Sequence, residues 1–432
     1  MKVLVLGSGG REHALVWKLA SSAQVSRMWC APGNAGIGQE RLAANGNLIE
    51  NVAISADDLV NLADFAATQQ VDLTVVGPDN PLALGVVDYF QKRGLRIWGP
   101  NQRAAQFESS KAFSQDFMER HGIPTMQSGV FTEPAAAKQF CARFGGRCAV
   151  KADGLALGKG VLLTRSMVEA DAAVDEILVR HTFGAAGVRV VIQELIEGVE
   201  ISLHALCDGK TAKLFPSAQD HKRALEGDLG LNTGGMGTYS PAPFLNDTEL
   251  AEVGRQILDP WIRGCAAEGI DFRGLLYPGV MLTPAGPKVI EFNARFGDPE
   301  TQVYLTRLQS DLLDALSASV DGTLGQTELI WSRQASVCVV MASGGYPGSY
   351  QKGLPISGLE VASGLPHTKI FHAGTALEDG RIVTNGGRVL GVTAWADDLR
   401  TARDRAYAAV DLIHFEGAHV RRDIAAKGLG SA

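Results

Sequence analysis

Over the first hundred residues, short apolar runs alternate with amphipathic helical patterns. Apolar side chains fill residues 2–6, a glycine turn follows at 7–10, and residues 12–20 place apolar side chains at helical spacing. Further apolar strands are predicted near residues 26–31, 72–76 and 96–98. Such alternation is typical of a doubly wound parallel sheet with helices on both faces and ligands at the carboxyl ends of its strands. We therefore expect an α/β domain at residues 1–108.

A different pattern begins near residue 109. One of the serines Ser109 and Ser110 is placed to cap a helix that carries Lys111 in its first turn, where a lysine is unfavourable to the helix dipole unless an anion lies nearby. Later, apolar strands are predicted at residues 275–282 and 288–292, joined by a short turn. These features predict an α+β region at residues 109–328.

Two strands, at residues 148–152 and 161–164, enclose the glycine-rich stretch ADGLALGKG. This arrangement predicts a β-hairpin within a lobe of about residues 125–195. The stretch does not follow the Walker pattern, which runs from a strand into a helix. A flap over phosphates would use the glycines Gly154 and Gly158 for close backbone approach and the lysines Lys151 and Lys159 for charge, whereas the alternative is an ordinary hairpin.

Two segments give less regular signals. Residues 219–237 combine a run of mixed charge with a glycine cluster, so a long ordered loop is expected there. After Pro299, apolar residues from Val303 to Leu313 recur at helical spacing, which predicts one helix.

The last section predicts a small α+β domain at residues 329–432. Short strands are expected at 336–341, 369–372 and 388–392, and apolar residues over 399–413 repeat at the spacing of one amphipathic helix.

Composition narrows the range of functions. Hydrophobic residues make up 46% of the 432-residue chain and no apolar run approaches the ~20 residues that span a bilayer, so we expect a cytoplasmic protein without a membrane partner. The formal charge of −7 and the absence of a basic stripe argue against a nucleic-acid partner. The six cysteines are too scattered for a zinc site or a disulfide framework.

The stretch VIEFNARFGDPE carries the clearest chemical signal. Glu291 and Asn293 are two apart on a predicted strand, so their oxygens project from the same face, and Arg295 adds a cation beside them. This combination suits Mg²⁺ bridging nucleotide phosphates next to a reacting anion. The alternative is an ion pair between Glu291 and Arg295 at a strand end.

The first glycine turn does not follow the dinucleotide-binding fingerprint. The third glycine of that pattern would fall at Glu12, and the strand before Ala31 lacks the acidic residue that would hold a ribose. Gly9, Gly10 and Arg11 instead have the donors to bind a phosphate, whereas the alternative is a plain structural turn.

Five motifs in order identify a resemblance to a known family: GGREHA at residue 9, KADGLALGKG at 151, QDHKR at 219, NTGGMG at 232 and EFNARFGDPE at 291. With these motifs the chain resembles the phosphoribosylamine-glycine ligase family, and the resemblance extends over essentially the whole length. It implies an ATP-grasp fold, in which two α+β lobes clamp ATP, preceded by the α/β domain and followed by the small C-terminal domain.

The resemblance also implies a reaction. Members join glycine to 5-phosphoribosylamine in purine biosynthesis, forming ADP and phosphate through a glycyl phosphate intermediate, with ATP and Mg²⁺ or Mn²⁺ as cofactors. A monomer is expected, with transient contact to the preceding pathway enzyme. Two departures from the family pattern, Leu157 and Leu231, affect loops.

The resemblance further implies roles for individual residues. Glu291 and Asn293 correspond to metal ligands, Arg295 to the group that stabilises the transferred phosphoryl, and Lys111 and Lys151 to phosphate contacts. Further nucleotide-binding positions are Gly154, Gly158, Lys159, Gln193, Glu194, Leu195, Ile196 and Glu200. Candidates for holding the glycine and ribose-phosphate substrates or for catalysis are Gly9, Gly10, Arg11, Asp220, Lys222, Arg223, Gly297 and Asp298.

Three other functions are compatible with part of this pattern. Another ATP-grasp ligase with different substrates would share these motifs. A nicotinamide-dependent oxidoreductase is suggested only by the first glycine turn, and a non-catalytic nucleotide-binding protein would not need Lys151, Glu291, Asn293 and Arg295 together. Many ATP-grasp relatives carry a second acidic metal ligand on the preceding strand, and residues 275–282 contain none.

Overall fold

The computed structural model describes residues 1–155 and 160–430. Its N-terminal part is a five-stranded sheet in the order β3-β2-β1-β4-β5, in which every pairing is parallel. The doubly wound sheet predicted from the sequence is confirmed. Its strands are β1 (Lys2–Gly7), β2 (Arg27–Pro32), β3 (Glu50–Asn51), β4 (Leu73–Val76) and β5 (Ile97–Trp98).

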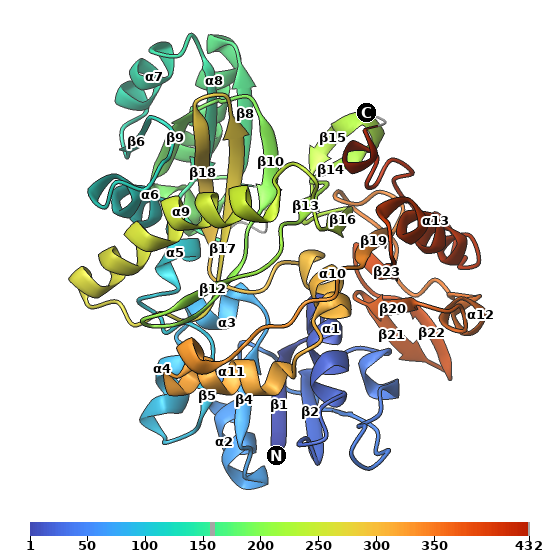
Figure 1. Ribbon diagram of the computed structural model, residues 1–432. Coiled ribbons are helices and arrows are strands. Elements are labelled where there is room, and N and C mark those ends of the chain that lie inside the picture. The colour runs from blue at the N-terminus through green and yellow to red at the C-terminus, as the bar shows by residue number, and fades with distance from the viewer. Residues whose placement is uncertain (156–159, 431–432) are drawn as a thin grey trace.

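Helices cover both faces of this sheet because β1 alternates its apolar side chains between them. Leu4 and Leu6 pack against α2 and α4, whereas Val3 and Val5 pack against α1 and α11 (Leu312–Asp321). Figure 1 shows α11, from late in the chain, lying across the N-terminal strands. The helices are α1 (Gly10–Ala20), α2 (Leu59–Gln69), α3 (Asp79–Ala83), α4 (Val86–Lys92) and the short η1 (Ile37–Gln39).

A separate lobe is built on the antiparallel sheet β6-β9-β7-β8. The predicted hairpin is present as the β7–β8 pair, and its tip, including Gly158 and Lys159, lies outside the described residues. Helices α7 and α8 cover one face (Figure 1). The elements are β6 (Ser128–Phe131), β7 (Arg147–Ala152), β8 (Val161–Arg165), β9 (Val190–Glu194), α7 (Pro134–Ala142), α8 (Met167–Val174), η2 (Asp175–Val179) and η3 (Gly184–Val188).

The central sheet contains the long β17–β18 hairpin that ends at the candidate metal ligands. Its core is an aromatic cluster around Phe107, whose ring contacts those of Phe117, Trp261 and Phe292. The strands are β10 (Val199–Ser202), β11 (Ala205–Asp208), β12 (Ala212–Leu214), β17 (Arg273–Thr283) and β18 (Gly286–Asn293). The helices that pack on it are α5 (Gln106–Ser109), α6 (Lys111–Arg120) and α9 (Asp247–Glu268).

The C-terminal sheet has the order β13-β16-β19-β23-β20, so it includes two strands from the middle of the chain. The boundary predicted at residue 328 therefore divides a hydrogen-bonded sheet, because β16 pairs with β19. Its strands are β13 (Gln219–Asp220), β16 (Gly237–Ser240), β19 (Ala335–Ala342), β20 (Thr368–His372) and β23 (Arg388–Ala396). Beside it lie α12 (Leu359–Ser363), α13 (Leu399–Val410), β21 (Thr375–Glu378), β22 (Arg381–Thr384) and η6 (Lys427–Leu429), whereas η5 (Leu324–Gln326) packs against α11.

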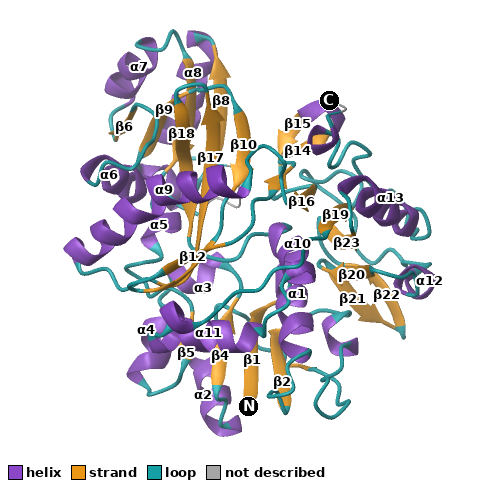
Figure 2. Ribbon diagram, in the orientation of Figure 1, coloured by secondary structure: helices purple, strands orange, loops and turns teal. Residues whose placement is uncertain are grey.

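The prediction of a long loop over residues 219–237 is wrong. The segment forms β13 and then a second hairpin, β14 (Arg223–Leu225) paired with β15 (Leu229–Asn232), with η4 (Glu226–Asp228) at its tip (Figure 2). Gly227, with φ of +66°, makes the turn. The charged run misled the prediction because its partners lie elsewhere in the chain. Lys222 pairs with Glu200, and the tip of the hairpin is held by the C-terminal Arg421, which pairs with Asp228.

The single helix predicted after Pro299 is two helices, α10 (Glu300–Arg307) and α11 (Leu312–Asp321). The chain is extended at Leu308, and the carboxylate of Asp311 caps α11 by accepting the N–H of Leu313 at 2.9 Å. Apolar spacing continued across this break, so the pattern alone gave no sign of it. Among the described helices, none combines the length and apolarity needed to cross a bilayer.

Buried histidines join the first helix to the C-terminal sheet. The N–H of His372 donates to Nδ1 of His13 at 2.8 Å, so Nε2 of His13 carries the proton that faces Glu40 Oε1 at 2.9 Å. Lys369 also pairs with Glu40. Burial lowers the pKa of His13, and burial with the nearby His13 and Lys369 lowers the pKa of His372 to about 3.

This junction predicts acid sensitivity. A histidine whose folded pKa lies below its ordinary value takes up a proton first in the unfolded chain, so stability is lost as pH falls from about 6.5 toward about 3. Urea titrations at about pH 7 and about pH 5.5 should show that His372→Asn removes about 1 kcal/mol of the wild-type loss. The control His414→Asn, at an exposed side chain, should keep the full loss. Equal pH dependence in all three proteins would contradict the assignment.

Candidate active site

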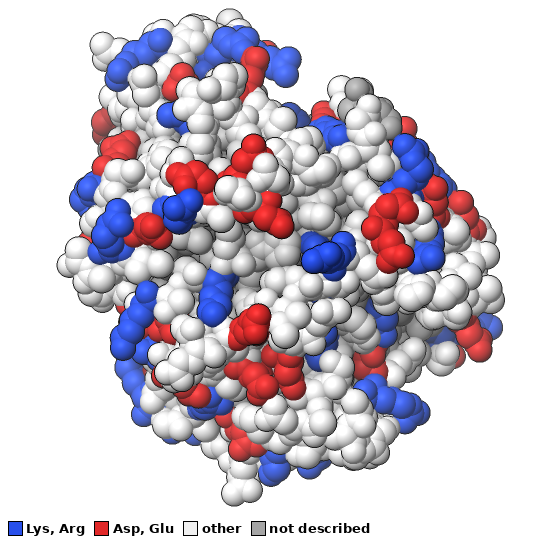
Figure 3. Space-filling model, in the orientation of Figure 1, with Lys and Arg blue, Asp and Glu red and all other residues white. Residues whose placement is uncertain are grey.

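A cavity of about 1140 Å³ opens where the lobe, the central sheet, the β14–β15 hairpin and the C-terminal part meet. Its volume exceeds the ~300–1,000 Å³ usual for small-ligand sites, so it has room for a nucleotide and a second small molecule. Figure 3 shows a notch in the outline between the lobe and the C-terminal end, with basic and acidic side chains interspersed on this face. The cavity contains the carboxyl end of β18, where the clearest sequence signal lies.

Glu291 and Asn293 both face this cavity, as their spacing predicted. They lie opposite Gly279 and Tyr277 of β17, beyond a bulge in the pairing, so both keep the same face. Burial opposes the charge on Glu291, but Lys222 and Lys151 outweigh it and lower the pKa of this carboxyl to about 2. Asn293 donates to the Tyr277 carbonyl at 3.4 Å and keeps its amide oxygen near Arg295.

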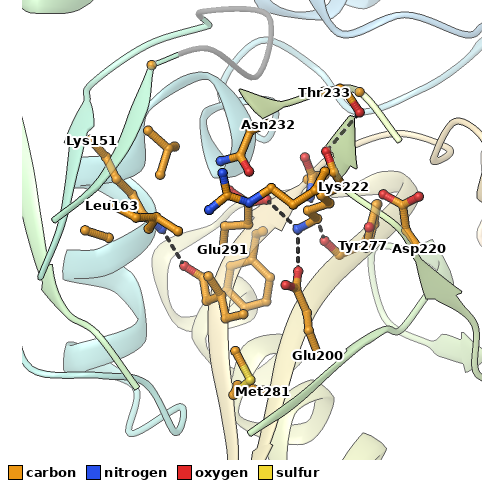
Figure 4. Close-up of a pocket in the computed structure, with 18 of the residues that line it drawn as sticks. Lys151, Leu163, Glu200, Asp220, Lys222, Asn232, Thr233, Tyr277, Met281 and Glu291 are labelled. Carbon is orange, nitrogen blue, oxygen red and sulfur yellow. Dashed lines mark hydrogen bonds and ion pairs between the residues drawn. The ribbon is translucent and has the colours of Figure 1, made fainter. Parts of the chain in front are cut away.

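Lys222 connects two of the predicted site residues. Its ammonium pairs with Glu200 and lies 3.8 Å from Glu291, as the dashed lines in Figure 4 show. Burial works against the charge on Lys222, but Glu200 and Glu291 raise its pKa. A cation thus already lies beside Glu291.

This arrangement tests the fit for a metal. The described residues contain no group of three or more His, Cys, Asp or Glu side chains suited to one ion. The Glu291 carboxylate and the Asn293 amide oxygen are hard donors of the kind Mg²⁺ takes when substrate phosphates complete its shell. The ammonium of Lys222 beside Glu291 shows that this carboxylate accommodates a positive charge, as it would with a metal ion. The residues therefore fit a divalent ion whose coordination is completed by phosphates.

Two lysines flank this pair from the lobe side. Lys151 at the end of β7 donates to the Ile290 carbonyl at 3.1 Å, and Lys111 at the start of α6 donates to the Gly154 carbonyl at 3.2 Å. Burial, opposed by Glu291, lowers the pKa of Lys151 to about 8. Ser110 is the serine that caps α6, by accepting the N–H of Phe113 at 3.1 Å. Both lysines therefore line the cavity with their charges available to an anion.

The end of β9 and the connection to β10 form another wall of the cavity. Gln193 and Glu194 of β9 and Leu195 and Ile196 after it all line the cavity. The Gln193 side chain donates to Gln115 Oε1 at 2.8 Å, and its own oxygen is buried without a partner among the described residues. A planar ligand with hydrogen-bonding edges would suit this wall.

Arg295 does not pair with Glu291, so the alternative interpretation of the E-x-N-x-R stretch is wrong. Its guanidinium pairs with Glu108 at 2.9 Å, whereas the ammonium of Lys222 lies 3.8 Å from Glu291. The partner lies far away in sequence, on α5, and local spacing contained no signal for it.

The first glycine turn uses its donors within the protein. The N–H of Gly9 donates to Glu12 Oε2 at 2.6 Å, and Arg11 pairs with Glu12 at 2.5 Å and donates to the Phe296 carbonyl at 3.1 Å. The expectation that Gly9, Gly10 and Arg11 hold a phosphate stays a prediction, and Arg11 does line the cavity. A Cβ at Gly10 would lie 2.7 Å from Nε2 of Gln302 on α10, so a larger residue there would displace that side chain.

The acidic candidates Asp298 and Asp220 lie on the C-terminal side of the cavity. Asp298 pairs with Arg388 at 3.0 Å and accepts from Gln302 at 2.8 Å, and it follows Gly297 in the turn before α10. Asp220 accepts the N–H of His221 at 2.7 Å. Burial and the nearby Glu300 raise the pKa of Asp220 well above its usual range.

Several residues that shape the cavity had no assigned role in the sequence analysis: Glu108, Gln115, Tyr277, Glu300 and Arg388. Glu300 closes the GDPE motif, and its carboxylate accepts from the Tyr277 hydroxyl at 2.6 Å. Its place in that motif was the one signal available, because the others become partners only in three dimensions.

Comparisons with known proteins agree with this geometry. Family models described as the N domain, the ATP-grasp (A) domain and the C domain of phosphoribosylglycinamide synthetase match residues 1–108, 109–301 and 336–427. Phosphoribosylamine–glycine ligase from Vibrio cholerae is 48% identical over 425 residues, covering 98% of this chain and 97% of the relative. The chain belongs to the phosphoribosylglycinamide synthetase family. The resemblance inferred from the motifs is thereby confirmed.

Other members of the family and of its fold extend this result. The enzyme of that name from Allochromatium vinosum is 49% identical over 98% of both chains. The crystal structure of the Thermotoga maritima enzyme matches with a TM-score of 0.83 at 33% identity, over 98% of this chain and 100% of that one. The biotin carboxylase domain of Hydrogenobacter thermophilus 2-oxoglutarate carboxylase, solved with MgADP, has a TM-score of 0.73 at 16% identity, which shows the shared ATP-grasp fold alone.

The C-terminal tail holds the β14–β15 hairpin. This hairpin contributes Arg223 and Asn232 to the lining of the cavity, and Thr233, which follows β15, also lines it. The side chain of Arg421 is fully buried, pairs with Asp228 at 3.0 Å and Asp423 at 2.6 Å, and donates to the Arg223 carbonyl at 3.0 Å. Arg421 thus joins the tail to the hairpin.

Arg421→Met should therefore loosen this wall. Arg421→Met leaves the carboxylates of Asp228 and Asp423 without this partner, but both are partly exposed, so the cost should stay below the about 3–5 kcal/mol of a fully buried pair. The control Arg422→Met breaks a half-exposed pair worth about 0–1 kcal/mol. Urea unfolding should show this difference, and limited proteolysis with mass spectrometry should find new cleavage within residues 223–232 only in Arg421→Met. Identical stability and cleavage in the two variants would argue against a role for Arg421 in holding the hairpin.

Proposed function

We propose that this protein joins glycine to 5-phosphoribosylamine at the expense of ATP, forming glycinamide ribonucleotide, ADP and phosphate in de novo purine biosynthesis. The observation that carries the proposal is the set of Glu291, Asn293, Lys151 and Arg295 around one cavity in a chain of this family. Interspersed surface charge and a cavity of this size suit small-molecule substrates rather than a polyanion.

A carboxylate is a poor electrophile, so the reaction is proposed to begin with phosphoryl transfer. The glycine carboxylate attacks the terminal phosphorus of ATP, the bond to ADP breaks, and glycyl phosphate forms. The amine of phosphoribosylamine then attacks the acyl carbon, phosphate leaves, and the amine releases a proton. The protein mainly positions the reactants and offsets charge in these steps.

Each cavity residue has a proposed part in this chemistry. Lys111 and Lys151 hold the phosphates, and Arg295 stabilises charge on the transferred group. Glu291 and Asn293 would hold Mg²⁺ or Mn²⁺, which supplies charge neutralisation between the phosphates when bound. The lobe that carries Gly154 would close over the phosphates and exclude water, and Gly158 and Lys159 are proposed to belong to this flap.

The remaining residues are proposed to select the substrates. The β9–β10 connection (Gln193, Glu194, Leu195 and Ile196) would meet adenine, mainly through backbone groups, and Glu200 would accept from the ribose hydroxyls once Lys222 moves away. Asp220 and Asp298, with Lys222 and Arg223, would hold glycine and the ribose phosphate. We further propose that the protein acts in the cytoplasm as a monomer, receiving its labile amine through brief contact with the enzyme that makes it.

The substrate requirement tests this function directly. ADP release should need glycine and phosphoribosylamine together, with the amine generated in place from ribose 5-phosphate and ammonia. Neither substrate alone should support more than background turnover. Release that depends on another carboxylate and amine would instead indicate a different ATP-grasp ligase.

The metal assignment has its own test. Glu291→Ala should lower kcat at least about 1000-fold at every Mg²⁺ concentration, because the charge and geometry that the carboxylate gives the ion are missing even when the ion is bound. Circular dichroism should report an intact fold, and the control Glu378→Ala, at an exposed carboxylate, should retain wild-type activity. Activity retained by Glu291→Ala without any change in its Mg²⁺ dependence would contradict this role for Glu291.

A further inference from the structure

Glu108 is a buried carboxylate for which the proposed reaction has no use so far. It lies on α5, in the segment that joins the N-terminal sheet to α6, and the residue is 9% exposed. Its Oε2 accepts the backbone N–H of Ala294 at 2.8 Å, and its Oε1 pairs with Nη2 of Arg295 at 2.9 Å. One carboxylate therefore holds both the backbone and the side chain of the turn that follows Asn293.

The guanidinium of Arg295 is held by the protein and still meets the cavity. Its Nη1 donates to the Phe296 carbonyl at 3.2 Å, and Nη2 approaches Asn293 Oδ1 at 3.4 Å in addition to Glu108. Its Nε is shielded by the protein, but Arg295 lines the cavity and its side chain is 19% exposed. The exposed part of this cation is therefore available to an anion in the cavity, and the proposed anion is the transferred phosphoryl group.

Arg295 needs an outside support to keep this orientation. It lies two residues past the end of β18, and a free arginine side chain carries about 2 kcal/mol of rotamer entropy. Among the described residues, Glu108 is the one carboxylate within ion-pair distance of Arg295. The carboxylate is itself fixed because it sits on a helix and accepts from the backbone. Its position can therefore determine where the guanidinium points.

We propose that Glu108 is the positioning residue for Arg295, holding its guanidinium at the cavity wall so that it faces the phosphoryl group in transit. This inference rests on the proposed function, since it assigns Arg295 to that group. It predicts a selective defect. Ground-state nucleotide binding should survive the loss of Glu108, whereas binding of a mimic of the transferred phosphoryl should not.

The first experiment compares wild type, Glu108→Gln and Glu50→Gln. Calorimetry would measure affinity for MgADP alone and for MgADP with aluminium fluoride, which imitates the phosphoryl group, with and without glycine. Glu108→Gln should weaken the aluminium fluoride complex about 10- to 100-fold, the range for a misoriented catalytic group, and leave MgADP affinity within about twofold. The control Glu50→Gln, which breaks the half-exposed pair with Arg27, should match wild type. A parallel loss of both affinities, or no loss, would overturn the proposal.

The second experiment separates positioning from a general structural role. In the Arg295→Met background, Glu108→Gln should lower kcat no further, because the group it orients is gone. Additive losses would overturn the proposal. If Glu108→Gln does not fold, Glu108→Asp is the alternative variant, because its shorter side chain keeps the charge but moves it away from Arg295. A decrease in kcat at unchanged KM for ATP is then expected, and a wild-type kcat would contradict the proposal. Glycine dependence in wild type reports separately on the proposed function, so the two failures are distinguishable.

Discussion

The charge on Glu291, which faces the cavity, depends on cations brought to it from other parts of the fold. An isolated carboxylate removed from water would be strongly disfavoured, so its neighbours decide whether it stays ionised. Lys151 reaches it from the lobe sheet and Lys222 from the segment after β13. The arrangement of the sheets around β18 therefore creates the electrostatic conditions under which a divalent ion and phosphates can be accommodated.

The same constraint explains why the C-terminal part contributes to a site centred elsewhere. Arg388 on β23 pairs with Asp298 and donates to the Gly234 carbonyl at 2.6 Å, so a strand of the C-terminal sheet holds the turn before α10. Arg421 holds the β14–β15 hairpin from the tail. Because β16 belongs to this sheet, the polypeptide passes through it before returning to β17 and β18. The cavity is thus a joint product of segments far apart in sequence.

The sequence allowed the elements with strong local signals to be predicted. Apolar runs located β1, β4 and β7, and the serines before Lys111 located the start of α6, because burial and capping act within a few residues. Residues 219–237 were missed because their hairpin depends on Arg421, Asp423 and other partners that no local pattern contains. The break at Leu308 was missed because the apolar spacing continues across it, although Asp311 carries a local capping signal.

The sequence by itself determined the family and the shared face of Glu291 and Asn293, since ordered motifs and strand periodicity are properties of the chain. Only the tertiary structure decided which groups those side chains meet. Glu108 reaches Ala294 across 186 positions, and Gly9 gives its N–H to Glu12 rather than leaving it for a ligand. Hydrogen-bond and charge partners are chosen by distance in space, and the packing of the whole chain sets that distance.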